Sequence, residues 1–307
     1  MSERLLVSNR AVNQAWSQSY WVGVDGGGTA CKARIYNSEH KTLGQGRAGP
    51  ANGFLAPESV RHSILEAVRE AVISAGLTTD DFARLHVGMA LAGADDQRVR
   101  QSLLRQHWPF ASVKINSDAY GACLGAFEGE NGAIQIVGTG SCGLLICNGK
   151  VSKVGGHEFP ISDQGSGAEL GLKAIRRTLL ACDGVADSSE LTDSIFQHFN
   201  HRIDAIVHWS KQARPADYGW FAREVFDCAD NDDPIAVDIV AQGVEDVVAF
   251  IRTLQQRGAE QVALMGSVAE RMKPRLLQRF GELIVEPRRD AMHGALLMAR
   301  ESAQKSD

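Results

Sequence analysis

Three consecutive glycines between an aspartate and a threonine, in the segment Asp25-Gly26-Gly27-Gly28-Thr29, form the first pattern that suggests chemistry. Glycines let the backbone close on a ligand and turn its N–H groups toward it, a geometry that suits phosphate oxygens. Asp25 follows the apolar segment 20–24 and is suited to hold Mg²⁺ through water, because this ion keeps much of its hydration shell. The alternative is a tight hairpin turn whose glycines serve only a positive φ.

A second loop of the same kind, Gly138-Thr139-Gly140-Ser141, lies further along the chain and again separates two strand-like segments. One glycine hairpin is a common turn, but two at corresponding positions suit a polyphosphate held from both sides. The hydroxyl groups of Thr139 and Ser141 would add hydrogen-bond donors. The repeated pattern therefore predicts a duplicated domain, each half beginning with its own hairpin.

The remaining segments alternate between helix-like and strand-like patterns. Apolar residues recur at helical spacing over 57–75 and 244–254, whereas 85–91, 113–116 and 261–265 are short apolar runs typical of strands. Such alternation predicts an α/β fold with mainly parallel or mixed sheets covered by helices.

With 307 residues the chain exceeds the size of a single hydrophobic core, so we expect two domains. We predict residues 20–130 for the first and 131–290 for the second, with a final helix over 291–303 that packs back on the first. Residues 1–19 mix charged and amide side chains and lack the apolar core of a signal peptide. We interpret them as an N-terminal extension.

Composition excludes several functional classes. A net charge of −5 gives no general attraction for nucleic acid or an anionic membrane, and no window of about 18 apolar residues predicts a membrane span. The six cysteines form no C-x-x-C pair and lie in segments that read as core, which argues against disulfides and zinc. We therefore expect a cytoplasmic protein without nucleic-acid or membrane partners.

Seven motifs in order resemble the sugar kinase and actin superfamily of ATPases, from about Tyr20 to about Arg300. More narrowly, the chain resembles the N-acetylglucosamine and glucosamine kinases of the BadF/BadG/BcrA/BcrD-type ATPase group. The motifs are Val24-Asp25-Gly26-Gly27-Gly28-Thr29, Ala51-Asn52-Gly53, Ser117-Asp118-Ala119-Tyr120-Gly121, Gly138-Thr139-Gly140-Ser141, Gly155-Gly156, Ser162-Asp163-Gln164-Gly165-Ser166-Gly167 and Met265-Gly266-Ser267.

The resemblance implies two RNase-H-like (actin-like) domains with ATP and a sugar bound in the cleft between them. It implies transfer of the γ-phosphoryl group of ATP, with Mg²⁺, to the 6-hydroxyl of an amino sugar. We also expect a homodimer. The residues that would contact ATP are Gly26, Gly27, Gly28, Thr29, Thr139 and Gly140 at the phosphates, and Gly266 and Ser267 at the adenosine.

Asp118 matches the catalytic base that takes the proton of the sugar hydroxyl. The alternative is that Asp118 only caps the following helix. Asn52 and Asp163 match residues that bind sugar hydroxyls. A pocket-lining role is implied for Ser141, Cys142, Gly156, His157 and Glu158.

Two departures concern the sugar. Gly155-Gly156-His157-Glu158-Phe159 stands where eukaryotic N-acetylglucosamine kinases have Gly-Gly-Trp-Gly-His, and Gln164 replaces a Glu after Asp163. The pattern is closer to bacterial glucosamine kinases, and the choice between glucosamine and N-acetylglucosamine stays open.

The alternative function is an ATPase activator of a radical dehydratase, which uses the same fold and holds an iron–sulfur cluster through cysteines. Cys123 and Cys142 are the candidate ligands. Their core-like surroundings make them a poor match to exposed cluster ligands.

Overall fold

The computed structural model describes residues 19–304, which separate into two compact units. The first contains residues 19–130 and 288–304, and the second contains residues 131–287. The chain thus returns to the first unit slightly before the predicted boundary at 290. Of the predicted N-terminal extension, all residues except Ser19 lie outside the described part of the chain.

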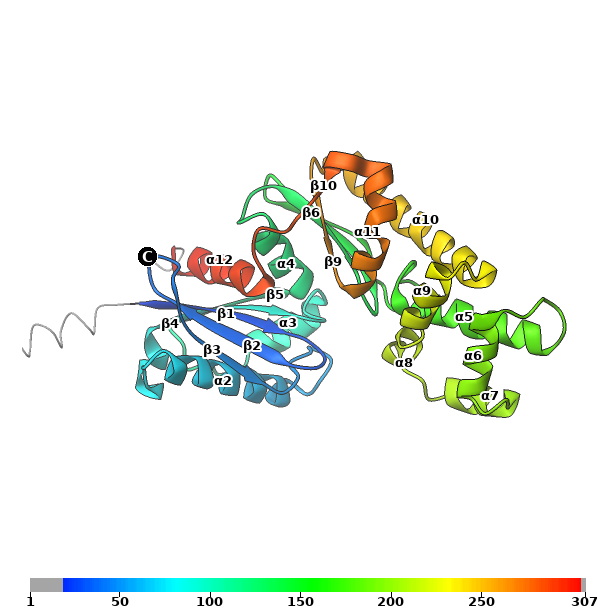
Figure 1. The fold of residues 1–307 in the computed structure, drawn as a ribbon. Helices are drawn as coiled ribbons and strands as arrows, with labels where there is room; N and C mark the ends of the chain where they lie inside the picture. The colour runs from blue at the N-terminus through cyan, green and yellow to red at the C-terminus, as the bar shows by residue number, and fades with distance from the viewer. Residues whose placement is uncertain (1–18, 305–307) are drawn as a thin grey trace, which may run out of the picture. The chain divides into compact units, whose positions relative to one another are not determined.

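The first unit is built on a five-stranded sheet of order β3-β2-β1-β4-β5 (Figure 1). Strands β1, β2 and β3 form an antiparallel meander, and β1, β4 and β5 run parallel. Its elements are β1 (Tyr20–Gly26), β2 (Cys31–Tyr36), β3 (Thr42–Ala48), α2 (Pro57–Ser74), η1 (Thr79–Arg84), β4 (Leu85–Leu91), α3 (Gln97–Leu104), β5 (Ser112–Ser117), α4 (Asp118–Ala126) and α12 (Ala291–Gln304).

The second unit repeats this topology in a sheet of order β10-β9-β6-β7-β8, with β6-β7-β8 antiparallel and β6, β9 and β10 parallel. Counted from the first strand of each unit, both sheets have the order 3-2-1-4-5. Its elements are β6 (Gly132–Val137), β7 (Ser141–Cys147), β8 (Lys150–Gly155), α5 (Gly167–Cys182), α6 (Glu190–His198), α7 (Ile203–Ser210), α8 (Pro215–Gly219), α9 (Ala222–Asp230), α10 (Pro234–Gln256), β9 (Val262–Met265), α11 (Ser267–Phe280), η2 (Gly281–Leu283) and β10 (Ile284–Val285). The predicted duplicated α/β fold is confirmed.

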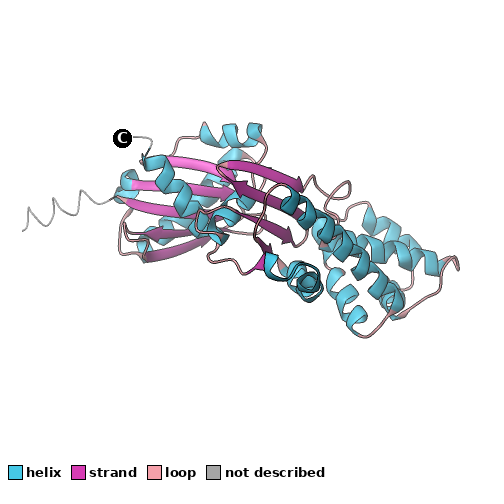
Figure 2. Ribbon diagram, turned by 90° about the horizontal axis from the view of Figure 1, so that it is seen from above, coloured by secondary structure: helices cyan, strands magenta, loops and turns pink. Residues whose placement is uncertain are grey.

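The second unit differs from the first in its larger helical part, which is visible beside the strands in Figure 2. Helices α5 to α9 lie between β8 and α10 in the chain, and α5, α6, α7 and α9 share one apolar core with the sheet. In this core α10 contacts β6, β7 and β8, and α5 contacts α6, α8, α9 and α10.

Alternation along the strands of the first unit gives the sheet two covered faces. In β1, Val22 and Val24 join the core beneath α2, while Gly23 between them faces α12. In β4, Val87 and Met89 face α2 and Gly88 faces α12. This is the two-residue period of a strand buried on both sides.

Glycines allow α12 to lie directly on the backbone of the strands (Figure 1, red helix). A Cβ atom at Gly23 would lie 2.0 Å from the Met292 carbonyl oxygen, and one at Gly88 would lie 1.9 Å from that of Ala295. No real Cβ tolerates such a distance, so these glycines are required by packing.

We expect Gly88→Ala to destabilise the protein by about 1–3 kcal/mol or more, the usual cost of overpacking, because the clash is with backbone that cannot turn aside. The measurement is the free energy of unfolding in urea. The control is Gly49→Ala, at an exposed position of the same unit where a Cβ would meet nothing closer than 3.7 Å. Equal stability of the two variants would contradict the proposed packing of α12.

Candidate functional site

The loop between β1 and β2 is held by backbone hydrogen bonds from three directions. Gly27 N–H donates to the Ala30 carbonyl at 3.0 Å, which closes the turn. Ala51 N–H donates to the Gly27 carbonyl at 3.0 Å, and Ala92 N–H donates to the Gly26 carbonyl at 2.8 Å. The loop is therefore fixed against the segments that follow β3 and β4.

The structural requirement for glycine differs among the three positions of this loop. A Cβ at Gly26 would lie 2.5 Å from Leu91 Cδ2 and 2.9 Å from the Ala51 carbonyl oxygen, so packing requires glycine there. At Gly27 and Gly28 a Cβ would meet nothing closer than 3.9 Å, and neither residue has a positive φ. Neither packing nor the turn therefore requires glycine at these two positions.

Asn52 lies beside this loop. Its Oδ1 accepts a hydrogen bond from Phe54 N–H at 2.9 Å, and Gly53 N–H donates to the Ala92 carbonyl at 2.8 Å. A Cβ at Gly28 would lie 3.9 Å from Asn52 Nδ2, so the amide group is adjacent to the glycine loop.

Strand register brings Asp25 and Asp118 to the same edge of the first sheet. Gly26 of β1 pairs with Leu91 of β4, which pairs with Ser117 of β5, so the three parallel strands end at one level. Ligands of α/β proteins bind at this carboxyl edge.

Asp118 is the first residue of α4, and the helix cap is its neighbour Ser117, whose Oγ accepts from Tyr120 N–H at 3.2 Å. The alternative that Asp118 is the N-cap is therefore wrong. Asp118 Oδ1 accepts from Ala119 N–H at 2.8 Å, and the side chain is half-buried.

Burial raises the pKa of Asp25, the Asp118 and Asp290 carboxylates raise it further, and the Lys32 ammonium opposes them. This concentration of negative charge at a half-buried carboxyl would be relieved by a cation. Across residues 19–304, no cluster of three or more His, Cys, Asp or Glu side chains is placed to hold a metal ion directly. The residues thus fit a water-mediated Mg²⁺ contact better than a protein cage.

The loop between β6 and β7 is anchored to the start of α5. Gly167 N–H donates to the Gly138 carbonyl at 2.8 Å, and Ala168 N–H donates to the Thr139 carbonyl at 3.1 Å. A Cβ at Gly138 would meet no atom within 4 Å, and this residue has no positive φ, so neither packing nor the turn requires its glycine. Thr139 is exposed.

Gly266 at the end of β9 lies directly against this loop. Its φ is +101°, and a Cβ would stand 2.4 Å from the Val137 carbonyl oxygen and 3.2 Å from Gly138 N. The predicted Gly266-Ser267 segment and the second glycine loop are therefore neighbours within one unit.

Asp163 is 8% exposed and lies against the same loop, where a Cβ at Gly140 would be 2.8 Å from its Oδ2. Burial raises its pKa, the N–H group of Ser141 lowers it by donating to the carboxylate, and the Glu158 charge raises it. Lys153 and the Phe159 N–H have smaller lowering effects, and the net shift of the pKa is upward.

The other predicted sugar contacts lie near Asp163 in the second unit. Gly156 has φ +67°, and a Cβ there would touch Cys142 Cβ and Sγ at 3.0 Å. Lys153 Nζ donates to the Gly156 carbonyl at 2.9 Å. His157 and Glu158 are exposed, and Glu158 has φ +73°.

The structure does not support the expectation that the Ser141 hydroxyl points at a phosphate. Ser141 is 2% exposed, and its Oγ accepts a hydrogen bond from the buried Gln135 at 3.2 Å. The side chain is turned into the core, and only its backbone N–H is directed toward Asp163.

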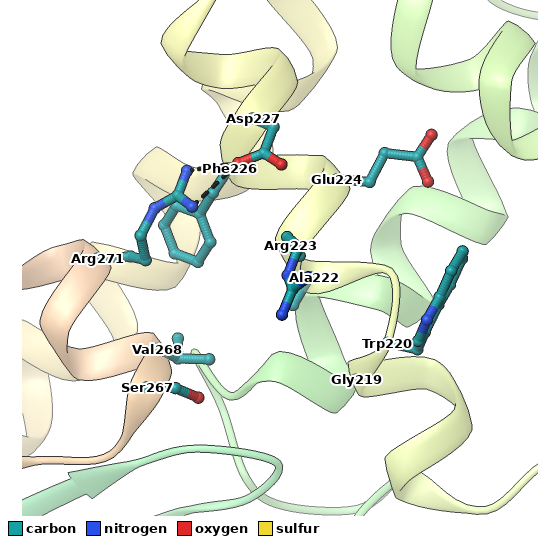
Figure 3. A pocket seen from close by; sticks show the side chains of 10 residues that line it. All are labelled: Gly219, Trp220, Ala222, Arg223, Glu224, Phe226, Asp227, Ser267, Val268 and Arg271. Carbon is teal, nitrogen blue, oxygen red and sulfur yellow. Dashed lines mark hydrogen bonds and ion pairs between the residues drawn. The ribbon is translucent and has the colours of Figure 1, made fainter.

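A cavity of about 650 Å³ adjoins the second loop, and of its lining only Ser267 was predicted from the sequence (Figure 3). Its wall near the loop includes Gly219, where a Cβ would lie 3.7 Å from Thr139 Cγ2. The lining residues are Gly219, Trp220, Ala222, Arg223, Glu224, Phe226, Asp227, Ser267, Val268 and Arg271. A run of aromatic residues over 218–221 was the available signal, but its pattern reads equally well as core.

Three of the charged groups that line this cavity, Glu224, Asp227 and Arg271, have polar partners within the second unit. Arg271 binds Asp227 at 3.0 Å and Asp230 at 2.9 Å, and it lies over the Phe226 ring at 4.9 Å from the centroid. Glu224 accepts from the Ser194 hydroxyl. Trp220, by contrast, is 60% exposed and presents its indole to the cavity. Size and an aromatic wall are typical of a small-molecule site.

Two sheets of identical strand order, each opening on a glycine hairpin, define a duplicated α/β fold of the actin-like ATPase class. The chain belongs to the BadF/BadG/BcrA/BcrD ATPase family, whose model matches residues 22–299.

Known proteins resemble the chain over most of its length. It is 48% identical over 281 residues to glucosamine kinase GspK of Vibrio cholerae serotype O1, covering 92% of this chain and 96% of that protein. A solved structure assigned as an N-acetylglucosamine kinase from Chromobacterium violaceum is 30% identical with a TM-score of 0.84, covering 92% of this chain and 99% of that one. N-acetylmuramic acid/N-acetylglucosamine kinase of Clostridium acetobutylicum is 29% identical over 181 residues, 57% of this chain and 58% of that protein.

These relatives do not favour the alternative of a cluster-bearing activator. Cys123 is fully buried in α4, and Cys142 lies in the other unit. Burial raises the pKa of the Cys31 thiol to about 12, with a further contribution from Asp25.

No helix in the described part of the chain is long and apolar enough to cross a membrane.

Replacing Asp163 tests the electrostatics of the second unit. Because its folded-state pKa is raised, ionised Asp163 lowers stability at neutral pH, and that penalty fades as pH falls through the raised pKa. We expect Asp163→Asn to be as stable as the wild type or more stable near pH 7, and to lose this advantage in acid. The measurement is the urea midpoint between about pH 2 and pH 8.

Asp233 provides the matched control with the opposite sign. Burial raises the pKa of this carboxyl, but donated bonds from Leu191 N–H at 3.0 Å and Ala236 N–H at 2.9 Å outweigh it and the pKa is lowered. Asp233→Asn should therefore lower the midpoint near pH 7, and this effect should fade as pH falls from the ordinary Asp pKa through the lowered one. If Asp163→Asn is instead less stable than the wild type at neutral pH, the pKa of Asp163 is not raised in the folded protein.

Proposed function

We propose that the protein transfers the γ-phosphoryl group of ATP to the 6-hydroxyl of an amino sugar, glucosamine or N-acetylglucosamine. The observation that carries this proposal is the pair of glycine loops. At Gly27, Gly28 and Gly138 neither φ nor packing requires glycine, so the backbone is left bare toward a ligand. The identity of 48% to a glucosamine kinase supports the sugar acceptor. We also propose that the protein acts in the cytoplasm, where ATP is supplied.

Each loop would bind phosphate oxygens of ATP through its backbone N–H groups, with Thr29 in the first loop and Thr139 in the second as exposed hydroxyl donors. The cavity beside Gly266 and Ser267 would take the adenosine, with the Trp220 indole as an aromatic wall. Base–aromatic stacking is worth about 1–3 kcal/mol, so Trp220 would contribute to nucleotide affinity.

Asp25 would hold Mg²⁺ through water. When bound, the ion neutralises charge that develops on the phosphoryl oxygens. The raised pKa of Asp25 and its Asp118 and Asp290 neighbours support a cation at this edge of the sheet.

Asp118 would act as the base for the sugar hydroxyl. Phosphoryl transfer is largely dissociative, so a correctly placed carboxylate of modest basicity is sufficient. Its position at the start of α4, just past the carboxyl end of β5, is fixed by the Ser117 cap.

Asn52 and Asp163 would bind sugar hydroxyls as acceptors, and Cys142, Gly156 and His157 would line the pocket. Ser141 would contribute through its backbone, since its hydroxyl is buried. The adjacency of Gly156 to Cys142 and of Asp163 to Gly140 supports a shared surface within the second unit.

The proposal predicts that ADP release depends on an amino sugar and on Asp118. The measurement is a coupled ADP-release assay with ATP, Mg²⁺ and glucosamine, N-acetylglucosamine, glucose, mannose or water. Amino sugars should give the highest kcat/KM, and Asp118→Asn should lower kcat by about 10²–10⁴-fold, the usual contribution of a positioned base.

A thermal unfolding scan with and without glucosamine controls for folding and binding in the Asp118→Asn variant. ADP release that is equal with all acceptors, or a variant with near-normal turnover, would contradict the proposed reaction or the role of Asp118.

Glu158 is proposed to favour the free 2-ammonium of glucosamine. Its exposed carboxylate lies close enough to raise the pKa of Asp163, and a charge-assisted hydrogen bond contributes about 1.5–3 kcal/mol. Glu158→Gln should lower kcat/KM for glucosamine about tenfold or more and leave N-acetylglucosamine nearly unchanged. Glu260→Gln, at an exposed position of the same unit, is the control. Equal losses for both sugars would exclude Glu158 as the selector.

A further inference from the structure

A fully buried amide side chain lies in the middle of β6. Gln135 is 0% exposed, and on its face of the strand Ala133 and Val137 belong to the apolar core of the second unit. A buried amide is unfavourable unless its polar atoms find hydrogen-bond partners. The partners of Gln135 therefore indicate why an amide occupies this position.

Of the two polar atoms in the Gln135 amide, only the nitrogen has hydrogen-bond partners. Its Nε2 donates to Ser141 Oγ at 3.2 Å and lies 3.3 Å from the Ile136 carbonyl oxygen. Its Oε1 has no partner and lies against Gly143, where a Cβ would be 2.8 Å away. The orientation is fixed by chemistry, because the Ile136 carbonyl can only accept and must face the NH₂ group.

This orientation determines the role of Ser141. Since the NH₂ group donates, Ser141 Oγ accepts, and the side chain is anchored inward at 2% exposure. The backbone of the same residue is thereby held with its N–H directed to the Asp163 carboxylate. A line of contacts therefore leads from the core amide to Ser141 and on to Asp163, whose Oδ2 lies against the neighbouring Gly140.

Asp163 depends on this support more than an ordinary loop carboxylate would. It has φ +68°, and its Oδ2 lies against Gly140, while the N–H groups of Ser141 and Phe159 lower its pKa. The charged groups that act on it are Glu158, from its own loop, and Lys153 of β8. Displacement of the Ser141 backbone would change the direction of the carboxylate and weaken an interaction that favours its charged form.

We infer that Gln135 is a positioning residue, which fixes the Asp163 carboxylate through the anchored Ser141 and so sets the affinity for the sugar. This inference rests on the proposed function, in which Asp163 binds a sugar hydroxyl. Gln135 does not touch the substrate, because it is completely buried.

The test is a double-mutant cycle of Gln135→Met and Ser141→Ala in the full-length protein. Met has about the length of Gln and removes the unpaired oxygen along with the donor, so the unfolding midpoint should not fall. Each single variant should raise the KM for glucosamine about three- to tenfold, as expected for one lost neutral hydrogen bond, and leave the KM for ATP unchanged. The double variant should be no worse than Ser141→Ala alone, because both changes remove the same Gln135–Ser141 hydrogen bond.

Three outcomes would overturn the inference. A lower unfolding midpoint with both KM values raised in Gln135→Met would show that the side chain serves packing only. Multiplicative effects in the double variant would show that Gln135 does not act through Ser141. An unchanged KM for glucosamine in Asp163→Asn would show that Asp163 does not bind the sugar. This result distinguishes a failure of the proposed sugar site from a failure of the coupling between Gln135 and Asp163 through Ser141.

Discussion

The parallel register of β1, β4 and β5 is the constraint on which the first candidate site depends. Because Gly26, Leu91 and Ser117 are paired across the sheet, all three strands end at one level. The residues that follow them, the glycine loop, Ala92 and Asp118, are then neighbours without any long side chain reaching across. A shift of one residue in β5 would turn every side chain of that strand to the opposite face and move Asp118 away from Asp25.

The glycines of this protein fall into two groups with different physical reasons. Gly23, Gly88 and Gly26 are required by contacts shorter than a Cβ can tolerate, so they belong to the packing of the fold. Gly27, Gly28 and Gly138 are required by neither packing nor φ. The second group is the stronger functional signal, because a bare backbone that the fold does not need is available to a ligand.

Part of this arrangement could be predicted from the sequence because the pattern is local. The strand at 85–91 has the predicted bounds, and the helix predicted over 57–75 occupies Pro57–Ser74. Strand β3 was not predicted, because its sequence carries glycines instead of a run of apolar residues. A Cβ at Gly46 would lie 2.1 Å from the Ala67 carbonyl oxygen, so close packing on α2 replaces apolar side chains there. The cavity at Trp220 and the inward turn of Ser141 depend on contacts between distant segments, which no local pattern contains.

The most direct test of the proposed reaction is the position of the phosphate on the product. The purified protein would be incubated with glucosamine, ATP and Mg²⁺, and the product would be examined by ³¹P–¹H correlation spectroscopy. We predict coupling of the new phosphorus to the two hydrogens on carbon 6 of the sugar, together with an equal amount of ADP. Inorganic phosphate as the only product, or phosphorus coupled to another sugar position, would contradict it.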